Sequence, residues 1–270
     1  MAQPARPALC DGALRTRVTG RVQSDAATEI SGVVLSRSRP GVLWALNDSG
    51  DSPRLLAFRT SGEPVAEVTL AGAENVDWED IATGRGGALL VGDIGDNQAQ
   101  RPSVVVYRVA EPRAPGTVAV AARYELRYPD GPRDAEALLF DRSTGAIVIV
   151  SKSYAGQDRV YVARRPSSRQ VTTMRRSART LRLGSGGAVT GGDVSADGAT
   201  IALRTYDSAY AWRRRKGESV AAALRRRPCR ARADLLAEGQ GEALALSRDG
   251  RVFITVPEGL RPPIRRYAAR

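Results

Sequence analysis

The stretch from Asp77 to Asn97 decides the fold: it reads DWEDIA at residues 77–82 and ALLVGDIGDN at residues 88–97. An acidic lead-in opens a short apolar segment, a tight turn follows, and a second apolar segment ends in an acidic loop. Short apolar runs bounded by turn residues are typical of buried β-strands. Because this pattern recurs along the chain, we interpret it as one unit of a repeat.

Four kinds of strand are expected to recur in a fixed order in these units. The first strands are expected at residues 30–34, 78–82, 135–139, 192–195 and 241–245. The second are expected at 42–46, 88–92, 146–150, 200–204 and 251–256, and the third at 54–59, 104–109, 159–164, 209–214 and 263–268. The fourth are expected at 66–70, 123–128, 179–183 and 232–236. Asp-Gly and Gly-Gly pairs between first and second strands favour hairpins.

The fifth unit ends at Arg270 without a fourth strand, whereas Leu14–Gly20 is a strand without a neighbour. Pairing these two would protect both exposed edges. We therefore predict an all-β fold, a five-bladed β-propeller whose last blade is closed by the N-terminal strand, with a short helical insertion within Gly217–Pro228. We expect one domain over residues 1–270, with blades at about 28–72, 73–129, 130–185, 186–237 and 238–270 plus 10–22. An antiparallel β-sandwich of similar short strands is the alternative.

The composition excludes several kinds of chemistry. The 270 residues carry a net charge of +12, and nearly all of the 41 basic residues are arginine. An arginine-rich exterior is the simplest interpretation, and nucleic-acid binding ranks lowest because these arginines fall largely on outer strands with few aromatic residues. The absence of histidine excludes histidine triads, metal sites and general bases. No apolar run approaches the length of a membrane span. We also expect the protein to be a monomer.

Cys10 and Cys229 are the only cysteines. Their spacing fits no metal site, so the alternatives are one disulfide and two buried thiols. Both precede segments assigned to outer strands of neighbouring blades, which favours a disulfide and an oxidising compartment. No export signal is visible, but the N-terminal residues fit a mature domain behind an added methionine. We therefore expect a secreted or cell-envelope protein.

The acidic residues are expected to gather on one face of the propeller. Segments that enter first strands and loops that leave second strands share a face, and Glu79, Glu136, Asp193 and Glu242 should surround the axial channel there. Carboxylates this close repel one another, which favours protonation or a hard cation, Ca²⁺ before Mg²⁺. A water-filled channel without metal, and aspartates that only hold loops, are the alternatives. The predicted metal ligands are Asp80, Asp93, Asp96, Asp193 and Glu242.

Two cations are expected beside these acids. Lys152 follows the second strand of the third unit, and Arg204 occupies the matching place in the fourth. The four candidate catalytic residues are Glu79 and Glu136 as general bases and Lys152 and Arg204 as stabilisers of developing negative charge. A lysine that only neutralises nearby carboxylates is the alternative. The candidate ligand-binding residues are Asp48, Tyr206 and Glu258.

Several motifs resemble a known family. SG at residues 31–32, EAL at 136–138 and at 242–244, and NDSG at 47–50 resemble secreted propellers of the phytase-like esterase or SdiA-regulated type. WEDIA at 78–82 with GDIGDN at 92–97 is similar to a group of uncharacterised exported bacterial propellers. The resemblance spans roughly residues 28–267 and implies a propeller fold, Ca²⁺, and hydrolysis of a phosphoester or ester. The chain lacks a recognisable phytase phosphate-binding motif and has five units where six blades are usual.

Three functions remain open from the sequence. The first is metal-assisted hydrolysis of a phosphoester, ester or lactone at the acidic face, with a carboxylate-pair glycosidase as a variant. The second is a non-catalytic propeller with a structural metal that binds a small molecule, a polymer or a protein at the same face. The third, binding of nucleic acid through arginines, predicts a steep salt dependence.

Overall fold

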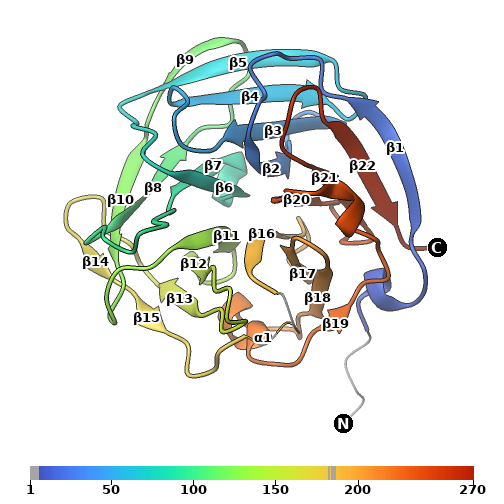
Figure 1. The fold of residues 1–270 in the computed structure, drawn as a ribbon. Coiled ribbons are helices and arrows are strands. Elements are labelled where there is room, and N and C mark those ends of the chain that lie inside the picture. The colour runs from blue at the N-terminus through green and yellow to red at the C-terminus, as the bar shows by residue number, and fades with distance from the viewer. Residues whose placement is uncertain (1–5, 182, 184–186) are drawn as a thin grey trace.

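The computed structural model describes residues 6–181, 183 and 187–270, and it confirms the predicted five-bladed β-propeller (Figure 1). Five sheets stand in a ring, and the first strand of each lies nearest the common axis. These inner strands are β2 (Ile30–Leu35), β6 (Trp78–Thr83), β11 (Ala135–Asp141), β16 (Val189–Val194) and β20 (Ala243–Leu246). We propose that the closed ring is a single domain with the blade limits given above.

The remaining strands continue each sheet outward. Second strands are β3 (Val42–Asn47), β7 (Leu89–Asp93), β12 (Ala146–Ser151), β17 (Thr200–Thr205) and β21 (Val252–Val256). Third strands are β4 (Arg54–Arg59), β8 (Val104–Val109), β13 (Val160–Ala163), β18 (Ala209–Arg213) and β22 (Pro263–Ala268). The outer strands are β5 (Pro64–Ala71), β10 (Ala122–Arg127), β15 (Arg175–Arg176), β19 (Cys229–Arg230) and β1 (Arg15–Arg21). Short 3₁₀ turns lie at Ala8–Cys10, Arg85–Gly87 and Leu236–Glu238.

The ring closes as the sequence predicts. Strand β1 pairs antiparallel with β22, with Thr16 opposite Tyr267, so the N-terminal strand completes the last blade. Cys10 and Cys229 form a disulfide with their Cα atoms 6.2 Å apart, which ties the N-terminal segment to β19 of the fourth sheet. The N-terminal strand thus completes the fifth blade, and the disulfide ties the segment before it to the fourth blade.

The core lies between neighbouring sheets. First and second strands are covered on both faces by adjacent blades. Every residue is therefore buried in β3, β6, β12, β16 and β17. Trp44 of the first sheet, for example, packs in one cluster with Trp78 and Tyr107 of the second. Continuous apolar burial of this kind explains why the inner strands were readable as short apolar runs.

The outermost strands differ from the prediction. The fourth strand of the third blade is only two residues long, at Arg175–Arg176 instead of 179–183, where Arg182 lies outside the described residues. In the fourth blade it is Cys229–Arg230, not 232–236. Exposed strands keep no apolar pattern to mark them, so their positions were wrong. Helix α1 (Val220–Leu224) lies within the predicted insertion.

Two further strands were not expected. Strand β9 (Gly116–Ala119) pairs in parallel with β5, and β14 (Thr172–Thr173) pairs in parallel with β10, so each crosses to the outer edge of the preceding blade. These additions cover strand edges that would otherwise be open to pairing with another chain. Along the described residues, the model contains no helix long and apolar enough to cross a membrane.

Candidate functional site

A β-bulge at the start of the inner strands places the central side chains. The pairing of inner and second strands skips one residue in four sheets, at Ser31, Glu79, Glu136 and Thr190. Glu242 takes the same place in the fifth, directly before the paired residue Ala243. A bulge re-aims the extra residue. Three of the five equivalent positions therefore present a glutamate at one end of the channel.

At the bulges of the first and fourth blades, Ser31 and Thr190 bond to the backbone of the next blade. The Ser31 hydroxyl donates to the carbonyl oxygens of Trp78 and Glu79, at 3.0 and 2.6 Å. The Thr190 hydroxyl donates to the carbonyl of Gly241 at 3.2 Å. Each short side chain thus ties its blade to the next, and the carboxylates come from the other three blades.

Glu79, Glu136 and Glu242 form the central carboxylate cluster. One carboxylate oxygen of each lies within 4.8 Å of the others, and the three residues are 2, 2 and 5% exposed. Burial raises the pKa of all three carboxyls. The neighbouring glutamates raise the pKa of Glu79 and Glu136 further, because like charges disfavour ionisation.

Lys152 is the cation of this cluster. Its Nζ lies 2.5 Å from Glu136 Oε1 and 3.8 Å from Glu242 Oε1. The Tyr206 hydroxyl donates to Glu242 Oε1 at 3.1 Å, and its ring lies 5.6 Å from the ammonium nitrogen. Despite its burial, the glutamates hold the pKa of Lys152 above its ordinary value. The structure therefore brings Lys152 together with four other predicted residues, which are Glu79, Glu136, Tyr206 and Glu242.

A second group of acids adjoins the central cluster at the opening. Oxygens of Asp48, Asp77 and Glu79 also lie within 4.8 Å of one another. Burial, followed by the nearby charge of Asp48, raises the pKa of Asp77 to about 7. Burial and Glu242 raise the pKa of Glu258 to about 7. Asp48 and Glu258 were predicted here, whereas Asp77 was missed as a site residue although it opens the lead-in.

The donor set fits a hard cation. Glu136 Oε2 is buried and has no hydrogen-bond partner in the described part of the chain, although Oε1 of the same carboxylate is bound to Lys152. A buried carboxylate oxygen without a donor is costly unless something positive faces it. Oxygen ligands from Glu79, Glu136 and Glu242 suit Ca²⁺ better than a thiophilic metal.

Asp193 does not join the cluster, contrary to the expected convergence of four carboxylates. The inner strand β16 begins at Val189, so its bulge residue is Thr190, and Asp193 lies three residues further along the channel. Its oxygens accept the N–H groups of Val194 and Leu246, at 2.7 and 2.8 Å. Asp193 thereby ties the fourth blade to the fifth, and it is not a member of the carboxylate group.

Asp80 has the corresponding role between the second and third blades. Its two oxygens accept the N–H groups of Ile81 and Leu138, both at 2.8 Å. Asp80 is fully buried and adjoins Glu79 in sequence, but it is occupied by backbone donors. We therefore leave Asp80 and Asp193 out of the proposed metal ligands.

Three other predicted residues are engaged elsewhere. Asp93 pairs with Arg101 at 2.8 Å, and Asp96 accepts the N–H groups of Gln100 and Arg101, both at 2.9 Å. Both aspartates therefore hold the loop after β7. Arg204 is fully buried in an ion pair with Glu238 at 2.9 Å, with Nη1 also donating to a backbone carbonyl. Nη1 of Arg204 therefore contacts protein groups, whereas its Nη2 is buried without a hydrogen-bond partner among the described residues.

An open cavity of about 330 Å³ leads to Lys152 from the side. It lies between loops of the second and third blades, and its polar lining includes Arg133, Asp134, Tyr154 and Arg159. The cavity therefore borders Lys152, the least exposed of its lining cations, whereas none of the three glutamates of the cluster lines it. A cavity of this size is at the lower end of those that hold small ligands.

Comparison with known proteins gives a fold without a family. No protein-family model and no curated protein matches the sequence. A gluconolactonase from Xanthomonas campestris has a similar structure, with a TM-score of 0.54 at 12% identity, over 100% of this chain and 96% of that one. Two other structures align less well. One, a provisional gluconolactonase, gives 0.47 at 15% identity over 99% and 97% of the chains. The other, a provisional 6-phosphogluconolactonase from Bacteroides uniformis, gives 0.45 at 17% identity over 88% and 67%. At these identities, the first likeness supports the propeller fold alone.

Proposed function

We propose that this propeller binds Ca²⁺ through Glu79, Glu136 and Glu242 and hydrolyses a lactone, ester or phosphoester at the acidic opening. The observation that carries the proposal is Glu136 Oε2, a buried carboxylate oxygen that no described donor reaches. It belongs to a group of three glutamates with raised pKa values. Such a group is stabilised by a bound divalent cation, which supplies the missing positive charge.

The balance of charge supports a cation beyond Lys152. The three glutamates are joined at the opening by Asp48, Asp77 and Glu258, whereas one ammonium group lies within ion-pair distance of the central three among the described residues. Lys152 neutralises at most one of these carboxylates. The remaining negative charge must be removed by protons or by a metal ion, and at neutral pH a metal ion is favoured where the ligands are preorganised.

The residues of the chain have distinct proposed roles. A bound Ca²⁺ would polarise the carbonyl or phosphoryl oxygen of the substrate. Asp77 is half-buried at the opening, with an oxygen within 4.8 Å of one of Glu79, and is placed to accept a proton from the attacking water. Lys152 fixes Glu136 and presents its ammonium to the side cavity, where an anionic group of the substrate would lie. Tyr206 orients Glu242 through its hydroxyl.

Lactones come first among the substrates to be tested. The Xanthomonas campestris protein with the same fold is a gluconolactonase, and a lactone is hydrolysed by the polarisation and water activation described above. The disulfide between Cys10 and Cys229 supports our proposal that the protein works outside the cytoplasm, since such bonds persist in oxidising compartments.

The test begins with metal content and calorimetric titration of the chelated protein with Ca²⁺ and Mg²⁺. Turnover is then measured on sugar lactones, aryl esters, phosphoesters and aryl glycosides, with and without chelator. Glu136→Gln should abolish turnover and weaken Ca²⁺ binding while the protein stays folded. Glu63→Gln is the matched control, because Glu63 is exposed and contacts only Arg59. Saturable metal binding equal in both variants would overturn the proposal.

A non-catalytic propeller with a structural metal is the second candidate. The observation in its favour is the burial of the glutamates, which leaves little room for a substrate to reach them directly. In that case Ca²⁺ raises the unfolding temperature, and no substrate in the panel is turned over. Metal-dependent melting without turnover would therefore select this candidate over the hydrolase.

A further inference from the structure

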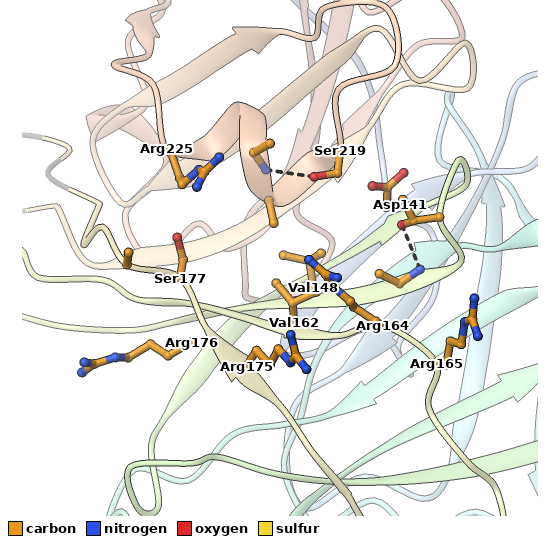
Figure 2. A pocket seen from close by; sticks show the side chains of 15 residues that line it. Asp141, Val148, Val162, Arg164, Arg165, Arg175, Arg176, Ser177, Ser219 and Arg225 are labelled. Atoms are coloured by element: carbon orange, nitrogen blue, oxygen red, sulfur yellow. Dashed lines mark hydrogen bonds between the residues drawn. The ribbon is translucent and has the colours of Figure 1, made fainter.

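A second cavity, of about 530 Å³, lies on the outer side of the ring between the third and fourth blades (Figure 2). It opens where the third blade is incomplete. Strand β15 pairs with β13 only at Tyr161 and Val162, so the outer strand of this blade is short. Helix α1, an insertion in the fourth blade, forms the opposite wall.

The walls of this cavity are fixed in place. Asp141 at the end of β11 accepts the N–H of Val220 at 3.0 Å, which joins the start of α1 to the third blade. The Ser219 hydroxyl caps the helix by accepting the N–H of Ala222 at 3.2 Å (Figure 2). Asp141 also accepts from Ser143 and lies 3.4 Å from Arg214, so the one carboxylate in the lining is already occupied. A preorganised cavity costs a ligand less ordering free energy.

The floor of the cavity is apolar. Ala146 and Val148 of β12 are buried, Val162 of β13 is half-buried, and Ala221 and Ala222 of α1 face them. The hydroxyl side chains of Thr144, Ser177 and Ser219 also line the cavity. Small apolar side chains on two facing elements form a slot that fits a hydrocarbon chain or ring.

The rim of the cavity is cationic. Arg164, Arg165, Arg175 and Arg225 line it, all are exposed, and none forms an ion pair with a carboxylate among the described residues. Figure 2 shows Arg164 and Arg175 reaching toward the wall formed by Val148 and Val162, whereas Arg176 points away. Arg176 instead pairs with Asp130 at 3.2 Å. Guanidinium groups bind carboxylate, sulfate and phosphate in a bidentate manner.

We propose that this cavity binds a small amphipathic anion, whose apolar body lies on the alanine and valine floor and whose acidic head contacts Arg164 and Arg175. The site shares no residue with the carboxylate cluster and is independent of the proposed hydrolysis. Its charge also differs in sign from that of the acidic opening. An anion would therefore be drawn to this side of the ring.

The experiment is calorimetric titration of the full chain with decanoate, at constant ionic strength. Acetate tests the head group alone, and decan-1-ol tests the chain alone. We expect saturable binding of one decanoate, with acetate and decan-1-ol each weaker by at least about tenfold, because each lacks one of the two contacts. Absence of saturable decanoate binding would overturn the proposal.

Two variants locate the bound anion, and one controls for charge. The double variant Arg164→Gln/Arg175→Gln should weaken the affinity for decanoate by about tenfold or more. Ala222→Phe should abolish decanoate binding, because the larger side chain fills the slot. Arg15→Gln/Arg17→Gln removes the same charge from exposed positions on β1 in another blade, and should leave binding unchanged. Equal loss in both double variants would show non-specific attraction to an arginine-rich surface and would refute the site. Unchanged binding in Ala222→Phe, checked to be folded by its melting curve, would refute it as well.

Discussion

Lys152 and Glu136 form an ion pair at the centre of the propeller, with Nζ 2.5 Å from Oε1 and both side chains at least nine-tenths buried. Glu136 Oε1 therefore has a partner, whereas Oε2 is buried without a hydrogen-bond donor among the described residues. The lysine is one of only two in the chain, and it lies where the negative charge is greatest. We therefore expect stability and the proposed metal binding to be coupled at this residue.

Lys152→Met is expected to destabilise the protein strongly when metal is absent. Removing one partner of a buried ion pair leaves a carboxylate with no compensating charge, at a cost of about 3 kcal/mol. Because the variant has more unbalanced negative charge, added Ca²⁺ should recover more stability in it than in the wild type. The measurement is denaturant unfolding in chelator and at saturating Ca²⁺.

Lys216→Met is the matched control for this prediction. Lys216 is exposed and is the only other lysine, so the substitution removes the same charge and the same side chain. Its free energy of unfolding should stay within about 0.5 kcal/mol of the wild type in both conditions. Equal losses in the two variants would contradict a central role for Lys152.

Stability without metal is expected to fall as the pH rises from 5 to 8. Burial holds the pKa of Asp77 and Glu258 at about 7, and the pKa values of Glu79, Glu136 and Glu242 are also raised. Between their unfolded and folded pKa values, the folded state binds more protons than the unfolded state. The free energy of unfolding therefore decreases with rising pH, as these carboxyls are forced to ionise in the folded protein.

Ca²⁺ should reverse this trend, because it binds the ionised carboxylates and its affinity rises with pH. Histidine, the side chain that ordinarily titrates in this window, is absent, but burial also raises the pKa of Asp158 to about 7 and that of Asp193 to about 6. Carboxylates with lowered pKa values, such as Asp130 and Asp141, lose their contribution only when the pH falls below about 4. Melting temperatures in chelator that rise steadily from pH 5 to 8 would contradict the prediction.

The sequence was sufficient for the ring but not for its outer edge. Inner strands such as 135–141 carry an apolar run, here residues 137–140, because they are covered on both faces by neighbouring blades, and this left a readable repeat. The short β15 and the parallel strands β9 and β14 depend on which edges remain open after the sheets have formed. That is a tertiary consequence, and local residue patterns do not record it.

The site was predictable to the extent that the repeat register was right. Glu79, Glu136 and Glu242 align correctly because an apolar residue follows each at the same spacing. In the fourth unit, Gly191 and Gly192 carry no apolar signal, so the alignment slipped by three residues and chose Asp193 over Thr190. As a result, Asp193 was predicted to be a metal ligand, whereas its carboxylate ties the fourth blade to the fifth.

The disulfide is expected to account for a large part of the stability. It closes a loop between Cys10 and Cys229 with a sequence separation of 219, and a cross-link across a loop of this length contributes about 5 kcal/mol in the chain-entropy model. Reductant should therefore lower the unfolding temperature of the wild type. The double variant Cys10→Ala/Cys229→Ala should melt at the lower temperature with or without reductant, and a wild type unaffected by reductant would contradict this.

Gly95→Ala is expected to impair metal binding more than folding. A Cβ at Gly95 would overlap Glu79 Oε1 and the carboxylate of Asp77, and the glycine does not require a positive φ, so only the site is disturbed. Displacing a supported ligand costs about tenfold in metal affinity. Calorimetric titration with Ca²⁺ and a melting curve measure the two effects separately. Gly12→Ala, where nothing lies within 4 Å of the added Cβ, is the control and should bind Ca²⁺ as the wild type does. If Gly95→Ala also binds Ca²⁺ as tightly as the wild type, Glu79 is not a ligand.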